Sequence, residues 1–197
     1  MRKKWIVLAI AIAFAFVSVG FSKWRKESMV QELAEEVLRF HVLANSDNAA
    51  DQRLKMQVKE AIITYMKEKL PEAESVEQTT RWAGEHLEEL EQVALRIIRE
   101  EGYNYPVSAE VVYDEFPEKT YGDVIFPAGR YHALRVEIGQ AKGQNWWCVL
   151  YPNLCFIDAV HAVVPEESKQ ELQHVLEEDT YHMITNPPRW KISWFFF

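Results

Sequence analysis

Alternation of apolar and polar residues marks several segments of the chain as β-strands. In residues 37–43 the side chains of Leu38, Phe40 and Val42 lie on one face, which is the period of two that a strand requires. Alternation, or a short run that is apolar on both faces, recurs in residues 107–113, 132–138, 145–150 and 190–196. The pattern therefore predicts one early strand and a sheet completed by the second half of the chain.

Two long segments have the helical period instead. In residues 51–70 apolar side chains recur every three or four positions, and Pro71 ends the pattern. A second helix is predicted over residues 76–101, because Gly102 stands where a left-handed C-terminal cap belongs. Residues 166–178 predict a short acidic helix. Together these elements predict an α+β fold, an antiparallel sheet with two long helices packed on one face.

The connections between these elements are rich in turn-forming residues. Residues 45–48, Asn-Ser-Asp-Asn, follow the first strand, and such side chains cap a helix or bond their own backbone in a turn. Residues 114–130 contain two prolines and two glycines and predict a long, turn-rich loop. No internal repeat and no Pro-rich or Gly/Ser-rich linker divides the chain, so we expect a single domain.

The amino terminus has the pattern of an export signal. Arg2, Lys3 and Lys4 precede 17 residues without a charge, Trp5 to Phe21, and Lys23 follows. A positive start before an apolar run is typical of a signal peptide, and this run is also barely long enough to span a bilayer. A buried core helix is the alternative, although such helices seldom lack a polar stripe. We therefore predict that residues 1–27 are an export signal or an N-terminal membrane anchor, and residues 28–197 a single extracytoplasmic domain.

The charge balance restricts the classes of partner. The 197 residues contain 22 Lys and Arg against 30 Asp and Glu, for a net charge of −8, and three of the basic residues precede the apolar run. Nucleic-acid binding depends largely on clustered basic residues that neutralise phosphates. The composition therefore argues against a nucleic-acid partner and against adsorption to anionic lipid, and predicts membrane contact only through the N-terminal segment.

Cys148 and Cys155 are the only cysteines. If residues 151–152 form the tip of a hairpin, the two cysteines lie opposite each other, and an oxidising compartment permits a disulfide between them. Two buried free thiols are the alternative. A catalytic thiolate is disfavoured, because the apolar neighbours of Cys148, Trp146 and Trp147 among them, raise a thiol pKa.

No other pattern predicts an active site. The six histidines lack the spacing of a metal site or a catalytic pair; they are His41, His86, His132, His161, His174 and His182. No nucleophile motif, phosphate-binding glycine loop or dinucleotide fingerprint is present in the sequence. We therefore predict no catalytic residue, no cofactor and no metal.

Three longer strings carry a family resemblance. They are Leu-Arg-Phe-His-Val-Leu-Ala-Asn-Ser-Asp at residues 38–47, Phe-Pro-Ala-Gly-Arg-Tyr-His-Ala-Leu-Arg-Val at residues 126–136, and Asn-Trp-Trp-Cys-Val-Leu-Tyr-Pro-Asn-Leu-Cys-Phe at residues 145–156. With the spacing between them, they resemble the stage II sporulation protein R family over about residues 33–160. The C-terminal part, residues 162–197 with its aromatic end, departs from that pattern.

This resemblance implies a signalling protein without catalysis or cofactor. Members of that family are exported from the forespore to the intermembrane space, where they act on a membrane-embedded aspartic protease of the mother cell that processes pro-sigma-E. Loops on a rigid sheet commonly carry recognition, so we expect receptor contacts at Asn45, Ser46 and Asp47 and at Phe126, Pro127, Ala128 and Gly129; capping and turn geometry is the alternative for each. An exported cell-wall hydrolase, with a cleft of convergent polar groups, or an envelope-binding module remains the competing hypothesis.

Overall fold

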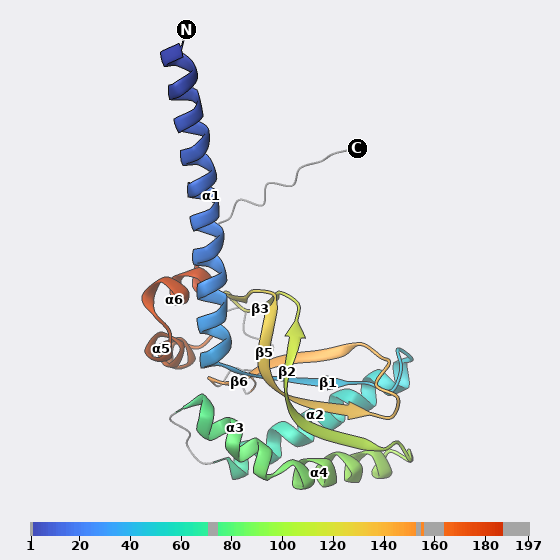
Figure 1. The fold of residues 1–197 in the computed structure, drawn as a ribbon. Helices are drawn as coiled ribbons and strands as arrows, with labels where there is room; N and C mark the ends of the chain where they lie inside the picture. Colours follow the sequence, from blue (N-terminus) through green and yellow to red (C-terminus); the bar gives the residue numbers. More distant parts are fainter. Residues whose placement is uncertain (1, 71–74, 153–154, 156–163, 187–197) are drawn as a thin grey trace.

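The computed structural model describes residues 2–70, 75–152, 155 and 164–186, with residues 2–4, 6–12 and 15 described by their backbone alone. Figure 1 shows a long helix that leads into a layered domain. The elements follow the order α1 (Arg2–Glu36), β1 (Leu38–Leu43), α2 (Ala49–Lys69), α3 (Val76–Glu85), α4 (Leu87–Glu100), β2 (Val107–Phe116), β3 (Lys119–Tyr121), β4 (Val124–Phe126), β5 (Gly129–Ile138), β6 (Asn145–Tyr151), α5 (Glu166–Val175) and α6 (Glu178–Thr185).

Four of the strands form the main sheet, in the order β2-β5-β1-β6. β1 is parallel to β5, whereas β2 pairs with β5 and β6 pairs with β1 in antiparallel fashion. The parallel pair is possible because α2, α3, α4 and β2 to β4 lie between its strands in sequence, and parallel strands need a long crossover. The predicted α+β fold is confirmed, with a sheet that is mostly antiparallel.

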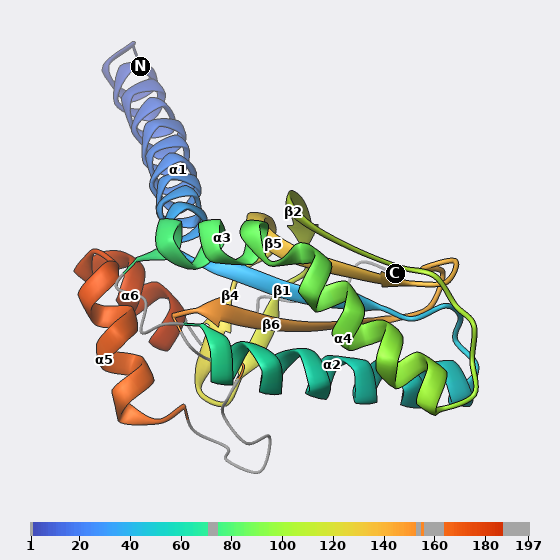
Figure 2. The ribbon, with the colours of Figure 1, turned by 90° about the horizontal axis from the view of Figure 1, so that it is seen from below.

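The main core lies between this sheet and the layer formed by α2, α3 and α4 (Figures 1 and 2). Phe40, Val42 and Leu134 point from the sheet into it and are fully buried. The helices contribute the apolar stripe that the sequence predicts, with Leu54, Val58, Ile62, Leu90, Ala94 and Ile98 buried. Each large side chain buried in this way contributes about 1.5–3 kcal/mol to folding, so the helix–sheet contact is the principal source of stability.

The single helix predicted over residues 76–101 is wrong, because the chain forms two helices that meet at His86. His86 has φ −117° and ψ 21°, outside the helical region. Its ring stacks on Trp82 with centroids 4.2 Å apart, and its Nδ1 lies 2.8 Å from the carbonyl oxygen of Trp82. This local contact, next to the weak helix former Gly84, interrupts the helix while the apolar stripe continues on both sides.

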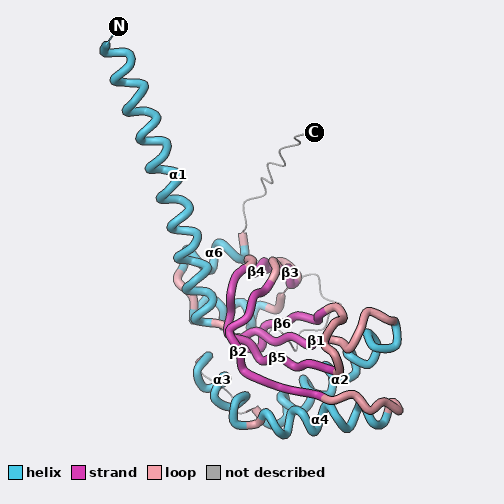
Figure 3. Tube along the Cα trace, turned by 45° about the vertical axis from the view of Figure 1, so that its right-hand side comes forward, coloured by secondary structure: helices cyan, strands magenta, loops and turns pink. Residues whose placement is uncertain are grey.

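The loop predicted over residues 114–130 is also wrong. β2 continues to Phe116, and β3 and β4 form a separate two-stranded hairpin closed at Gly122, whose φ is +56°. Figure 3 shows this hairpin at the end of the sheet that lies near α6. Strands of three residues are too short to produce a visible alternation of apolar and polar residues. The prolines and glycines in the turns around them therefore made the whole segment resemble a loop.

A second core lies on the other face of the sheet, at the end where the hairpin sits. Leu33 and Ala34 from α1 are buried there with Phe116 and Phe126, and Leu172 and Ile184 add one side chain each from α5 and α6. The helix that starts at Arg2 therefore continues past the apolar run, and its last turns belong to the domain. Among the described residues, no helix combines the length and the apolar composition needed to cross a membrane.

The C-terminal part differs from its predicted form where it can be compared. The acidic helix predicted over residues 166–178 is present as α5, which ends three residues earlier, and α6, which the sequence did not predict, follows after Leu176 and Glu177. Glu32 of α1 accepts hydrogen bonds from the backbone N–H of Glu177 and the hydroxyl of Thr180. The start of α6 is therefore hydrogen-bonded to α1. The strand predicted over residues 190–196 lies outside the described residues.

Candidate functional site

The loop after β1 and the turn after β5 form one hydrogen-bonded unit at the same end of the sheet. Asn45 Oδ1 accepts from the backbone N–H of Gln140 at 2.9 Å, and Asp47 Oδ1 accepts from the N–H of Gln144 at 2.7 Å. A β-carbon at Gly139, whose φ is +63°, would overlap with the side chain of Asn45. The two segments therefore approach so closely that glycine is required at this position.

Asp51, buried in the first turn of α2, is the centre of this unit. Its Oδ2 accepts hydrogen bonds from Asn45 at 2.8 Å, from Ser46 at 2.6 Å and from Asn48 at 2.9 Å. The Asn48 side chain in turn caps α2 by accepting from the N–H of Asp51 at 2.8 Å. Burial acts to raise the pKa of Asp51, but the hydrogen bonds from Ser46, Asn45 and Asn48 outweigh it and keep that pKa below its ordinary value.

The second predicted contact segment, Phe126 to Gly129, lies at the opposite end of the sheet. Phe126 is fully buried in the second core, and the Pro127 carbonyl accepts a hydrogen bond from the Tyr131 hydroxyl at 2.8 Å. A β-carbon at Gly129 would lie 3.1 Å from Cγ1 of Val30 in α1. Ala128 is exposed, at the turn between β4 and β5.

The structure therefore does not bring the two predicted segments together. Asn45, Ser46 and Asp47 follow the end of β1, whereas Phe126 to Gly129 lead into the parallel strand β5, whose first residue is Gly129. The ten residues of β5 separate them by about 30 Å. Both segments have a structural role, through the helix cap and through the packing against α1, and their contact with a receptor stays a prediction.

Arg39 is a buried cation that the sequence did not single out. It is fully buried on the second face of β1, and its guanidinium carbon lies over four aromatic rings, at 4.4 Å from Phe116, 4.9 Å from Tyr131, 5.2 Å from Phe126 and 5.9 Å from Tyr121. Its Nε donates to the Cys148 carbonyl at 3.3 Å and its Nη2 to the Tyr121 hydroxyl at 3.1 Å, while Nη1 has no hydrogen-bond partner. Burial lowers the pKa of Arg39 from its ordinary value.

Four residues in register form a polar and aromatic row across the same face, next to the second core. Glu110 of β2 lies beside Arg135 of β5, Arg135 beside His41 of β1, and His41 beside Trp147 of β6. The His41 ring stacks on Trp147 with centroids 5.0 Å apart and an interplanar angle of 13°. It also contacts Phe116, with centroids 5.1 Å apart, and Phe116 and Trp147 contact each other at 4.7 Å.

His41 is buried without a hydrogen bond on either ring nitrogen. Its Nε2 lies 3.6 Å from Oδ2 of Asp114, which is too far for a hydrogen bond. Burial lowers the pKa of His41 to about 4; Asp114 acts to raise it, and Arg135 and Arg39 lower it further. The imidazole is therefore neutral at pH 7.

Arg135 joins the row to three carboxylates. Its Nη2 forms an ion pair with Glu110, its Nη1 lies 3.1 Å from Asp114 and its Nε lies 3.4 Å from Glu137. The hydrogen bond that Arg135 donates to Glu110 is the main reason that the pKa of Arg135 lies above its ordinary value. Arg39, His41 and this cluster occupy one face of adjacent strands, which could be found only from the strand register.

Cys148 and Cys155 are joined by a disulfide, one of the two alternatives that the sequence leaves open, with their α-carbons 5.5 Å apart. Cys148 is buried on β6, and Cys155 lies in a turn rather than on a paired strand. The bond closes a short loop with a sequence separation of 7, so its effect on the entropy of the unfolded chain is small.

Replacing both cysteines with alanine is expected to lower the free energy of unfolding by about 1–3 kcal/mol, through the lost cross-link and the cavity beside Val149. Urea denaturation followed by circular dichroism measures the loss, with the reduced wild type as the matched control. If Cys148→Ser kept full stability but abolished every activity of the protein, a catalytic role for the thiol would have to be reconsidered.

The described histidines do not form a catalytic or metal-binding group. His86 is bonded to a backbone carbonyl oxygen and His182 lies 3.4 Å from an asparagine amide, while His132 and His174 are exposed and His161 lies outside the described residues. Over the described part of the chain, no three His, Cys, Asp or Glu side chains are placed to hold a metal ion.

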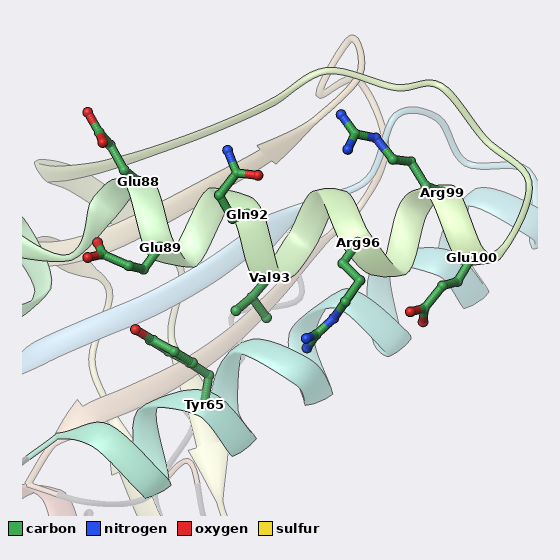
Figure 4. Close-up of a pocket in the computed structure, with 8 residues that line it drawn as sticks. All are labelled: Tyr65, Glu88, Glu89, Gln92, Val93, Arg96, Arg99 and Glu100. Carbon is green, nitrogen blue, oxygen red and sulfur yellow. The ribbon is translucent and has the colours of Figure 1, made fainter.

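A shallow groove lies between α2 and α4 (Figure 4). Val93 and Tyr65 lie toward the gap between the helices, with Arg96 beside them, whereas Glu88, Gln92 and Arg99 point away from α2. Charges of both signs line the groove without converging on one point. It has the character of a solvated helix surface and lacks the arrangement of an active site.

Comparison with known proteins shows the family of the chain. A family model described as stage II sporulation protein R matches residues 34–161. The chain belongs to this family. The stage II sporulation protein R of Bacillus subtilis (strain 168) is 31% identical over 191 residues, which cover 90% of the chain and 85% of that protein. No solved structure matches the chain significantly.

The match to the stage II sporulation protein R family begins in the last turn of α1 and ends before α5. It includes the capped loop at Asn45, the buried Arg39 and His41, and both cysteines of the disulfide. The helices α5 and α6, which complete the second core, lie outside the matched range.

Proposed function

We propose that this chain is an exported sporulation signalling protein, which binds a membrane-embedded aspartic protease of the mother cell and activates it to process pro-sigma-E. Membership of the stage II sporulation protein R family carries the proposal. In this proposal the domain is exported from the forespore to the intermembrane space, and the basic start and apolar run of residues 2–21 are the export signal or a tether.

The histidines and cysteines of the described residues are consistent with a protein that acts by binding a partner. Histidine ring nitrogens that have a described hydrogen-bond partner meet only a carbonyl oxygen and an asparagine amide, and both cysteines are in a disulfide. A binding protein favours the active arrangement of a protease only through a higher affinity for that arrangement. The reaction itself is then performed by residues of the protease.

Stoichiometry tests this proposal. We expect that the full-length protein, added to vesicles on the side that carries the extracytoplasmic part of the protease, raises processing of the precursor to a plateau as the protease becomes saturated. The rate should fall again when the protein is washed away. Full processing driven by a trace amount, or activity that persists after removal, would show covalent modification of the protease and contradict the proposal.

A further inference from the structure

A strip of the second sheet face carries an excess of partly exposed negative charge. It is formed by Glu110 and Asp114 of β2 and by Glu137 of β5, whose side chains are 47%, 31% and 32% exposed. Among the described residues, Arg135 is the only lysine or arginine in ion-pair contact with these three carboxylates. Its guanidinium contacts Oε1 of Glu110 and Oε1 of Glu137, and within the described part of the chain no donor contacts the second oxygen of either carboxylate.

The buried imidazole of His41 is the part of this cluster that the chain leaves incomplete. Its side chain is 2% exposed, neither ring nitrogen has a hydrogen-bond partner, and Nε2 faces Asp114 Oδ2 at 3.6 Å. Buried polar groups are nearly always paired in native proteins. A shift of Asp114 by less than about 1 Å would bring it within hydrogen-bonding distance of Nε2.

The neighbouring aromatic surface already holds a cation of the same chain. Lys119 Nζ of β3 lies 5.9 Å from the ring centre of Trp147, and Trp147 is half-buried beside His41. Carboxylates next to an indole ring attract ammonium and guanidinium groups, through charge and through the negative face of the ring.

We propose that the strip formed by Glu110, Asp114 and Glu137, on the same sheet face as Trp147, is a docking surface for a basic segment of a partner protein. A lysine or arginine side chain of that segment binds between the open oxygens of Glu110 and Glu137 and shares them with Arg135. Asp114 then closes toward His41 and completes the cluster. The existence of this surface does not depend on the proposed function. Only the statement that its partner is the protease rests on the proposed function.

A short peptide tests the surface directly. The probe is a dye-labelled peptide of alternating lysine and threonine with both ends capped, titrated with the full-length protein in neutral detergent at low salt and followed by fluorescence anisotropy. We expect saturable binding that weakens as salt is added, and no binding of the glutamate–threonine counterpart. Glu110→Gln combined with Glu137→Gln should weaken binding by about tenfold or more.

A matched variant separates this site from general attraction to an acidic protein. Glu88→Gln combined with Glu115→Gln removes the same charge from the exposed helix layer and from the opposite face of β2, and should change the affinity less than about twofold. Equal weakening by both pairs, or no saturable binding of the lysine peptide at low salt, would overturn the inference. Loss of peptide binding with protease activation intact would reject the surface and leave the proposed function standing.

Discussion

Replacing Arg39 with methionine is expected to leave the protein folded with a free energy of unfolding within about 1–2 kcal/mol of the wild type. Arg39→Ala and Arg39→Lys are expected to lose about 3–5 kcal/mol. The order of the three variants, with methionine well above the other two, is the specific expectation. Urea denaturation of each variant, followed by circular dichroism, measures it.

The order follows from the surroundings of the guanidinium. No described carboxylate forms an ion pair with Arg39, and the side chain is enclosed by Phe116, Tyr131, Phe126 and Tyr121. Contact with the rings offsets the cost of burying the cation, since a desolvated cation–π contact contributes about 2 kcal/mol. Methionine removes that cost and fills most of the space with a flexible apolar chain that packs well on aromatic rings.

Alanine and lysine each fail for a separate reason. Alanine leaves a cavity among the rings of the second core, which cannot collapse around it without moving β3 and β4. Lysine keeps the charge but is more strongly hydrated and cannot lie flat between the rings. A methionine variant as unstable as the alanine variant would show that the guanidinium stabilises the fold through its polar contacts, contrary to this account.

Arg39 also shows why the sequence predicted only half of the environment of β1. The alternation of Leu38, Phe40 and Val42 correctly assigned one face to the core, and an arginine and a histidine between them are typical of a face in water. Both are buried by aromatic side chains: Arg39 lies under rings of β2 to β5, and the His41 ring packs against Phe116 and Trp147. Several of the covering rings come from residues 114–130, whose prolines and glycines resemble a loop.

The candidate site could be predicted only where its interactions are local. Asn48 caps the helix that follows it directly, and this role is visible in the sequence. The contacts of Asn45 with Gln140 and of Arg135 with Glu110 join segments that are 95 and 25 residues apart. Their partners depend on the order and register of the strands, which no periodicity in a single sequence determines.

The stability of the protein is expected to fall by about 3 kcal/mol between pH 6.5 and pH 4 through His41 alone. The folded protein binds a proton at His41 with a pKa of about 4, whereas the ordinary value is 6.5. Between these values the unfolded chain binds more protons than the folded one, so the free energy of unfolding decreases as the pH falls. The unfolded histidine is half protonated at pH 6.5, so this contribution levels off at about one pH unit above that value, where both states are neutral.

His41→Phe isolates this effect from the carboxylates that titrate near the same pH. Phenylalanine keeps the ring contacts with Trp147 and Phe116 and removes two ring nitrogens that have no hydrogen-bond partner, so the variant should fold at pH 7. The difference in unfolding free energy between wild type and variant should then change by about 3 kcal/mol from pH 7 to pH 4. His132→Phe, at an exposed histidine on the opposite face of β5, is the control and should follow the wild-type curve.

The sign of the pH-dependent change in this difference of unfolding free energy decides between two arrangements of Asp114 and His41. If Asp114 moves onto His41 in solution and forms an ion pair with its protonated ring, the pKa of His41 rises and the wild type gains stability relative to His41→Phe as the pH falls. If the imidazole stays buried 3.6 Å from Asp114 and unpaired, the wild type loses stability relative to the variant. We expect the loss, because Arg135 holds Asp114 at 3.1 Å and lies close enough to oppose a second positive charge.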